Sequence, residues 1–260
     1  MWKYSLFSIF LSINLFAQNK QILIEYKFSD SNITRIDTLV ATETNMVFVR
    51  GNSFKDIGFS KRSELIKNDS EIKSNKVEVN LSKSKFYSSN HSDSLLIKFQ
   101  NSKKASLILD IVPIIDWEIK NEFKAILGIK CRKAEGNFRG SSIIAWYSEK
   151  IKIPFGPWKF KGLPGIILEI FNENNFNSEK WTAQNIILPY SEKINYLMLV
   201  YKEIDFIKYE QFVINRENKI QEQISRFQSR APVGVTMTKS SVNRVGIEKV
   251  YEWETENEKK

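Results

Sequence analysis

Short segments in which apolar and polar side chains alternate recur along most of this 260-residue chain. In the first, at residues 21–29, every second side chain from Ile22 to Phe28 is apolar, which is the period of a strand with one face on a core. Stretches rich in Ser, Asn, Asp and Lys separate such segments, a spacing that favours hairpins and meanders over a parallel sheet. The later segments are residues 46–50, 76–81, 95–100, 106–112, 117–120, 129–138 and 142–150.

Two apolar runs follow at residues 166–171 and 181–188, and the polar residues 172–177 separate them. Apolar runs of this length that flank a polar turn predict a buried hairpin. The tail at residues 246–253 alternates again, so we expect it to return to the sheet as a last strand.

Residues 203–230 have a different pattern, with apolar side chains at helical spacing amid Lys, Glu, Gln and Arg, which predicts an amphipathic helix. The fold expected is therefore mainly β: a single antiparallel curved sheet or partly open barrel with one long amphipathic helix near the C-terminus. We expect this helix to pack against or across the concave face of the sheet. The apolar positions are Phe206, Val213, Ile220, Ile224 and Phe227.

The N-terminus has the pattern of a secretory signal peptide. Lys3 precedes an apolar run at residues 4–16, and the small residue Ala17 ends it. The run is shorter than the ~20 residues that cross a bilayer, so we expect cleavage after Ala17 and no transmembrane span in the mature chain. Residues 1–17 are then the signal peptide, and residues 18–260 form a single β domain that is exported to the periplasm or outer membrane, or secreted.

Charge and cysteine content exclude some functions. The formal net charge is +9, but the lysines are scattered and not gathered with aromatic residues into a block, so we expect no nucleic-acid partner. Cys131 is the single cysteine, which excludes an intramolecular disulfide although export leads to an oxidising compartment.

A cluster of glycine and proline at residues 154–165 predicts a loop with fixed turns. We expect a type II turn in Leu163-Pro164-Gly165, with positive φ at Gly165. Three interpretations of this loop remain open: an architectural corner, a recognition loop on the sheet, or a catalytic element. The recognition interpretation gives the candidate binding residues Trp158, Lys159, Phe160, Gly162, Leu163, Pro164 and Gly165.

The same stretch resembles the signature of the GLPGLI family of exported envelope proteins. The resemblance rests on Ala145-Trp146-Tyr147, on the run from Ile153-Pro154-Phe155 through Leu163-Pro164-Gly165-Ile166-Ile167, on an upstream run at 126–134 and on the tail at 247–254. The namesake hexapeptide departs at Ile166, where the family has leucine, and this exchange of aliphatic side chains costs little. Residues 54–90 show no pattern of that family. The resemblance implies an exported protein and names no reaction.

This chain has few of the residues from which common catalytic sites are built. His91 is the sole histidine, so neither a histidine-based triad nor a multi-histidine zinc site is expected, and we expect no metal and no cofactor. Cys131 lies in a strand-like segment and is expected in the core. Paired carboxylates stay open as acid–base candidates. They are Asp110, Asp116, Glu118, Glu149 and Glu169, of which Glu169, inside an apolar run, needs a partner such as Lys159 or Arg132.

These observations favour a non-catalytic binding or accessory protein of the cell envelope, serving an envelope protein, a peptide or a lipid. The alternatives are a carboxylate-dependent hydrolase and a purely structural envelope protein. A deep apolar groove would favour the binding protein, whereas two carboxylates ~5–10 Å apart in a cleft would favour the hydrolase.

Overall fold

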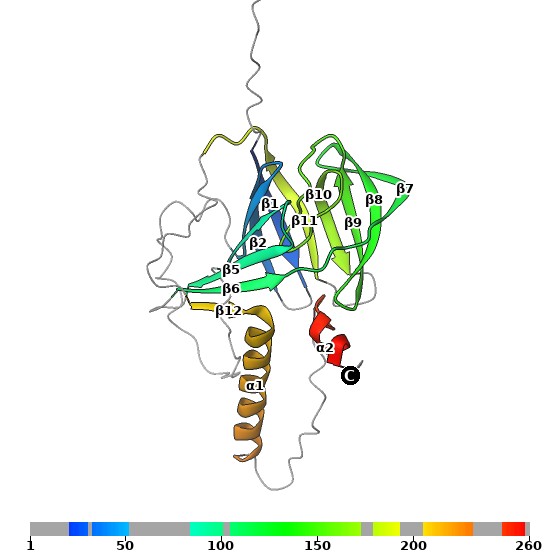
Figure 1. The fold of residues 1–260 in the computed structure, drawn as a ribbon. Helices are drawn as coiled ribbons and strands as arrows, with labels where there is room; N and C mark the ends of the chain where they lie inside the picture. Colours follow the sequence, from blue (N-terminus) through cyan, green and yellow to red (C-terminus); the bar gives the residue numbers. More distant parts are fainter. Residues whose placement is uncertain are drawn as a thin grey trace, which may run out of the picture.

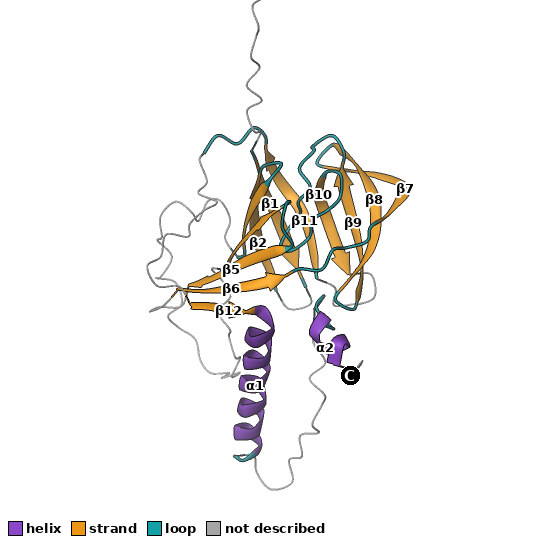
Figure 2. Cartoon of the chain, in the orientation of Figure 1, coloured by secondary structure: helices purple, strands orange, loops and turns teal. Residues whose placement is uncertain are grey.

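The computed structural model describes residues 21–30, 33–51, 84–100, 105–172, 179–192, 205–230 and 246–257. Twelve strands in these residues form one sheet, with two helices after them, as Figure 1 shows. The expected mainly β fold is confirmed, and strands dominate the molecule in Figure 2. The elements are β1 Ile22–Ser29, β2 Thr34–Ala41, β3 Asn45–Val49, β4 Lys85–Ser89, β5 Ser94–Gln100, β6 Ala105–Ile111, β7 Glu118–Ile126, β8 Ile129–Phe138, β9 Ser141–Ser148, β10 Ile166–Asn172, β11 Lys180–Ile187, β12 Asp205–Lys208, α1 Tyr209–Gln228 and α2 Glu252–Asn257.

Two antiparallel meanders make up the sheet. The strand order is β12-β6-β5-β4-β3-β2-β1-β11-β10-β9-β8-β7, so β1 to β6 form one meander and β7 to β11 the other. The two join where β1 pairs with β11 in antiparallel register. Every described strand pair is antiparallel except β12 with β6, which is parallel.

The connection from β6 to β7 forces the sheet to curl. Neighbouring strands lie ~4.8 Å apart, so in a flat sheet of this order β6 and β7 would be separated by roughly 48 Å. Residues 112–117 join them, and a chain of this length reaches at most about 25 Å. The sheet must therefore curve until its far strands approach each other, and Figure 1 shows this curvature. The sheet stays open, because β12 and β7 are its two edges.

The curled sheet encloses an apolar core. Tyr26 and Phe28 on β1 are buried, whereas Lys27 between them is exposed, as the alternation in the sequence predicts. The Tyr26 hydroxyl donates a hydrogen bond of 2.6 Å to the Ile167 carbonyl, so this buried phenol keeps a partner. Cys131 is fully buried in the same core, as expected, and burial raises the pKa of its thiol to about 11.

The long helix begins later than expected and lies elsewhere. Residues 205–208 form the edge strand β12, and α1 starts at Tyr209. Tyr209 and Val213 in its first turns are buried, and α1 contacts β6 and β12. The rest of α1 projects past the edge of the sheet in Figure 1, so the expected position across the concave face is wrong. Neither described helix is long and apolar enough to cross a membrane.

Among the other elements expected from the sequence, some are confirmed and others are wrong. The hairpin of β10 and β11 is confirmed as an antiparallel pair. The tail does not form a strand: residues 246–251 are irregular, and α2 begins at Glu252. The sequence pattern did not predict β2 or β4, and the segment expected at 76–81 and the leader at 1–17 lie outside the described residues.

The crossing of the β6–β7 connection over β8 generates a prediction about stability. A Cβ added at Gly136 would lie 2.8 Å from Ile115 Cγ2 and 3.1 Å from Trp117 Cε3. We expect Gly136→Ala to lower the free energy of unfolding by about 1–3 kcal/mol in denaturant titrations, because the connection must shift. Gly128→Ala is the matched control: its φ is +73° but nothing lies within 4 Å, so only backbone strain of ~1 kcal/mol is expected. A smaller effect at Gly136 than at Gly128 would contradict the close crossing.

Candidate functional site

The glycine- and proline-rich loop at residues 153–165 folds back on itself between β9 and β10. An isolated bridge pairs Phe155 with Lys161, and the Gly156 amide donates 2.8 Å to the Phe160 carbonyl. Trp158, at the tip, has φ 58°, which is rare for a large side chain and marks stored strain. The loop is therefore held in one conformation by its own backbone hydrogen bonds.

Gly165 is needed for a different reason from the one expected. Positive φ occurs at Gly162 (96°) and not at Gly165, so the expected left-handed turn position is wrong. A Cβ added at Gly165 would instead lie 2.0 Å from the Ser148 carbonyl oxygen, which is a backbone atom. The glycine lets the start of β10 approach the end of β9.

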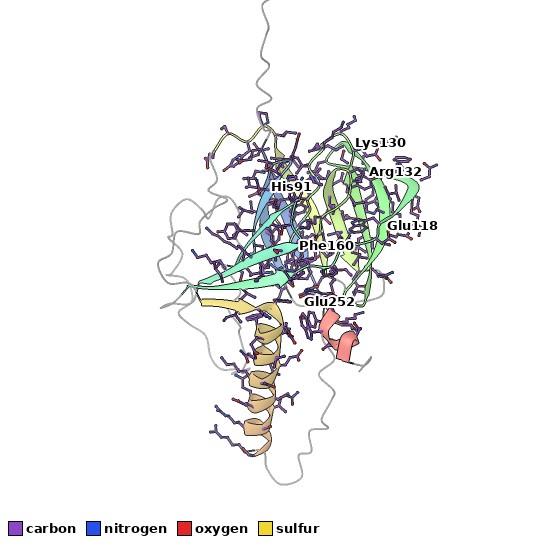
Figure 3. All side chains as sticks on the ribbon, in the orientation of Figure 1. His91, Glu118, Lys130, Arg132, Phe160 and Glu252 are labelled. Carbon is purple, nitrogen blue, oxygen red and sulfur yellow. The ribbon has the colours of Figure 1, made fainter. Side chains whose placement is uncertain are left out.

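The aromatic residues of the loop point into the core. Trp158 is 6% exposed and stacks on Trp181 of β11 with ring centres 5.9 Å apart. Phe160 is fully buried and meets Phe138 of β8 edge to face, and Figure 3 shows it inside the curled sheet. Leu163 and Gly165 are buried as well, so Gly162 and Pro164 are the candidate binding residues left exposed.

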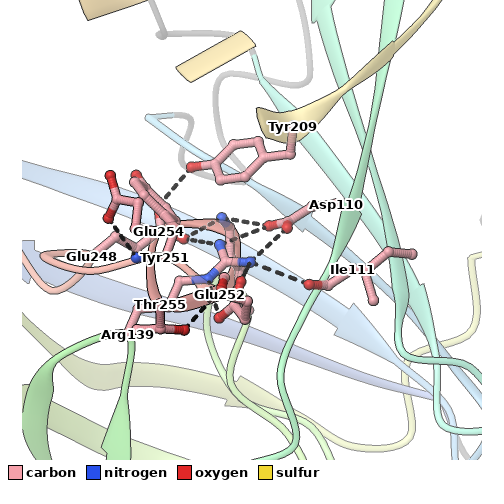
Figure 4. A network of polar contacts seen from close by, with 10 residues as sticks. Asp110, Ile111, Arg139, Tyr209, Glu248, Tyr251, Glu252, Glu254 and Thr255 are labelled. Carbon is pink, nitrogen blue, oxygen red and sulfur yellow. Dashed lines mark hydrogen bonds and ion pairs between the residues drawn. The ribbon is translucent and has the colours of Figure 1, made fainter. Parts of the chain in front are cut away.

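Lys159 enters a buried network of charges. Its ammonium lies 2.7 Å from Asp110 on β6 and 2.6 Å from Glu248 in the C-terminal segment. Arg139, from the β8–β9 turn, binds Asp110 with both terminal nitrogens, at 2.7 and 3.2 Å, and also contacts Glu248. Figure 4 shows how Asp110, Arg139 and Glu248 converge with Tyr209 and Glu252. We call Asp110, Arg139, Lys159 and Glu248 the buried charge network.

Burial and charge compete within this network. Burial would raise the pKa of Glu248, but Lys159 and Arg139 beside it outweigh burial and lower that pKa. Burial would likewise lower the pKa of Arg139, but hydrogen bonds to Asp110 and the charge of Glu248 raise it. The Tyr209 hydroxyl donates 2.6 Å to Glu248, and burial followed by that carboxylate raises the pKa of Tyr209. The Glu248 carboxylate and the Arg139 guanidinium therefore hold each other in their charged forms.

Lys161, two residues along, holds a different turn. Its ammonium donates 3.3 Å to the Ser88 hydroxyl and 3.1 Å to the Ser89 carbonyl, and it also contacts the Ser92 carbonyl, so it joins the loop to the β4–β5 turn. Trp117 Nε1 donates 3.0 Å to the carbonyl of Lys161. Burial lowers the pKa of Lys161, although Asp93 partly opposes this shift.

A cleft of about 400 Å³ opens where these three segments meet. The β4–β5 turn, the β6–β7 connection and the 153–165 loop each form part of its wall. Volumes in this range are typical of sites for small ligands. The lining residues are Asn90, Asp93, Val112, Pro113, Ile114, Ile115, Pro154, Lys159, Lys161 and Gly162.

Most other sequence candidates lie apart from this cleft. His91 is exposed within the β4–β5 turn but does not line the cleft, and Glu118 lies on the outer edge strand β7 (Figure 3). Glu169 has a cationic partner as expected, but the partners are Lys124 at 2.5 Å and Lys180 at 3.2 Å, not Lys159 or Arg132. Within the described ranges, no group of His, Cys, Asp or Glu side chains is arranged to hold a metal ion.

Sequence reasoning missed Arg139 and Glu248. Arg139 and Gly140 have φ of 44° and 79° between paired residues Phe138 and Ser141, which is the geometry of a two-residue type I′ hairpin. Asn, Asp and Gly dominate in such turns, so an arginine before glycine is unusual there. This unusual residue is the sequence feature that could have identified Arg139. No comparable sequence feature identified Glu248, because the pattern of the tail predicts a strand.

The buried charge network predicts unequal costs for removing similar lysines. We expect Lys159→Met to lower the free energy of unfolding by about 3–5 kcal/mol, because two buried carboxylates lose a partner. Lys120→Met, which removes a partner of Glu118 and Glu135, is the control and should leave the free energy of unfolding nearly unchanged, because the ion pair with Glu118 is open to solvent. Urea titrations of the two variants would show this difference, and equal costs would contradict it.

Gly165→Ala tests the close approach of β10 to β9. The added methyl would overlap a backbone carbonyl that no side-chain rotation can move, so we expect a loss of about 3 kcal/mol or failure to fold. Pro164→Ala, at the exposed neighbouring position, should cost about 1 kcal/mol or less. A native-like melting temperature for Gly165→Ala would rule out the overlap.

The comparisons with known proteins connect this fold to an enzyme family. A family model described as "N-glycanase peptide, N-terminal domain" matches residues 55–210, which is more than half of the chain. Two solved structures of PNGF-II, in space groups C2 and P21, each align with a TM-score of 0.52 and 14% identity. The alignments cover 74% of this chain and 32% of those proteins, so the chain spans about a third of their length. No curated protein matches the chain.

These matches correct the expected function. The sequence predicted a non-catalytic binding or accessory protein of the envelope, with a carboxylate hydrolase or a structural protein as alternatives. This prediction is wrong, because the matching family is defined as a domain of an N-glycanase. The structural likeness shows a shared β fold, because 14% identity supports nothing finer. The match extends through β4 to β12 and the loop at 153–165, and the chain belongs to the N-glycanase N-terminal domain family.

Proposed function

We propose that this chain acts on N-linked glycoproteins by binding the glycan-bearing part of the substrate. The observation that carries this proposal is the family match over residues 55–210. The alignments cover 32% of each solved relative, so about two thirds of those proteins lie outside the aligned part. Glycan release by a complete N-glycanase is therefore not an activity that we assign to this domain alone.

The cleft supports a substrate rich in hydroxyl groups. A sugar hydroxyl both donates and accepts hydrogen bonds, and the cleft wall offers an amide at Asn90 and a carboxylate at Asp93 for these bonds. The neighbouring apolar residues 112–115 can cover the C–H faces of a sugar ring. A few polar groups on an otherwise apolar wall are typical of sites that orient a small ligand.

Export belongs to the same proposal. The pattern of residues 1–17 predicts a signal peptide with cleavage after Ala17, which would deliver the chain to a compartment where glycoproteins from outside the cell are available. The position of the mature N-terminus at Gln18 stays a prediction.

The proposal predicts that binding depends on the glycan. Immobilised protein of residues 18–260 should retain a synthetic peptide with one N-linked glycan about tenfold more tightly than the same peptide without it, measured by biolayer interferometry. The reason is that the sugar supplies the hydrogen bonds and apolar faces that the cleft can match. A peptide with an O-linked sugar on serine is the linkage control. Equal retention of glycosylated and bare peptide would reject the proposal.

A further inference from the structure

The wall of the cleft is apolar on the side of the β6–β7 connection. Val112 and Ile115 are buried there, whereas Ile114 is 82% exposed, the highest exposure among the large apolar side chains of the described residues. Exposed apolar side chains that line a concave site are typical of ligand contact. The connection cannot withdraw, because it spans the two arms of the curled sheet and crosses β8 at Gly136.

The two lysines of the cleft are already engaged. Lys159 lies between the carboxylates of Asp110 and Glu248. The ammonium of Lys161 donates hydrogen bonds to three oxygen atoms at the β4–β5 turn, from Ser88, Ser89 and Ser92. An ammonium has three protons to donate, so Lys161 has none left for a ligand. The carboxylates of Asp110 and Glu248 therefore compensate the charge of Lys159, whereas Lys161 keeps its charge but has no ammonium proton left to bind an anionic ligand.

The polar groups that line the opening are an amide and a carboxylate. Asn90 Nδ2 donates a hydrogen bond of 2.8 Å to the Glu43 carbonyl, so one of the two amide protons of Asn90 is used. Asp93 contributes a negatively charged hydrogen-bond acceptor. An acidic ligand would meet Asp93 unfavourably, since like charges repel at short range. The lining thus offers one donor, one strong acceptor and an apolar wall.

We propose that this cleft binds an uncharged, N-acetylated sugar unit of the glycan, an inference that rests on the proposed function. An acetamido group has three parts that match the lining. Its N–H can donate to the Asp93 carboxylate, its carbonyl can accept from the Asn90 amide, and its methyl group can contact the apolar residues 112–115.

The choice of probes separates the acetamido group from the sugar ring. N,N′-diacetylchitobiose, called chitobiose here, and cellobiose are the same β1–4-linked disaccharide with acetamido groups and with hydroxyl groups at C2, respectively, and both are neutral. We expect isothermal titration calorimetry with the protein of residues 18–260 to show cellobiose binding about tenfold more weakly than chitobiose, because Asn90 and Asp93 would lose the acetamido group as a hydrogen-bond partner.

A second pair of probes tests charge. N-acetylmuramic acid carries the acetamido group of N-acetylglucosamine together with a carboxylate. We expect it to bind more weakly than N-acetylglucosamine by about tenfold, and inorganic phosphate to leave both titrations unchanged. Equal or tighter binding of N-acetylmuramic acid, or competition by phosphate, would overturn the neutral-sugar assignment in favour of an anion site.

Two exposed positions allow variants that keep the fold. Ile114→Asp places a charge on the apolar wall, and Asp93→Ala removes the acceptor; both should weaken chitobiose binding by about tenfold with unchanged melting temperature. Ile33→Asp, at an apolar position 50% exposed outside the cleft, and Glu222→Gln, an exposed carboxylate on α1, are the matched controls. Native chitobiose binding in both cleft variants would overturn the assignment.

Failure of this inference differs from failure of the proposed function. If the N-linked glycopeptide binds but chitobiose does not, or if the cleft variants retain it fully, the cleft assignment is wrong and the proposed function stands. If the glycopeptide binds no better than the bare peptide, the proposed function fails, and the chitobiose titration alone decides whether the cleft recognises acetamido sugars.

Discussion

The buried charge network of Asp110, Arg139, Lys159 and Glu248 is the interaction on which the arrangement of this molecule depends. Its members come from β6, the β8–β9 turn, the 153–165 loop and the C-terminal segment, four parts of the chain that no single pair of strands brings together. Burying charges is unfavourable unless each one finds partners, so the network forms only when all four segments are in place. It therefore couples the two meanders, the loop and the tail into one cooperative unit.

Two strained backbone conformations lie at or beside this network. Arg139 adopts a positive φ, and Trp158 next to Lys159 does so as well. Such conformations cost about 1–3 kcal/mol each and persist only where the surroundings determine them. At Arg139 the cost is offset by the paired guanidinium and by the Lys249 and Val250 amides, which donate 2.8 and 3.0 Å to its carbonyl. At Trp158 the stack on Trp181 supplies the compensating contact.

Local periodicity was sufficient to predict most strands, because alternation such as that at residues 22–28 follows from which face of one strand is buried. It could not predict that residues 246–251 leave the sheet, because Glu248 is held by cations from distant segments and not by a neighbouring strand. β2 escaped notice because five consecutive residues at its end are buried, so no alternation is visible. The GLPGLI resemblance singled out the 153–165 loop, and membership of that family stays a prediction.

The cleft shows the same limit of sequence reasoning at the level of function. Lys159 was expected as a binding residue of a recognition loop, but its ammonium and that of Lys161 each bind structural partners. What the loop contributes to the cleft is position: Lys159 fixes it against β6 and the tail, and Lys161 fixes it against the β4–β5 turn. A wall held at both ends keeps its shape before a ligand arrives, and a ligand then loses less free energy to ordering the protein. The two lysine charges thus act by holding the walls, and Asn90, Asp93 and the apolar residues between those walls remain to contact a ligand.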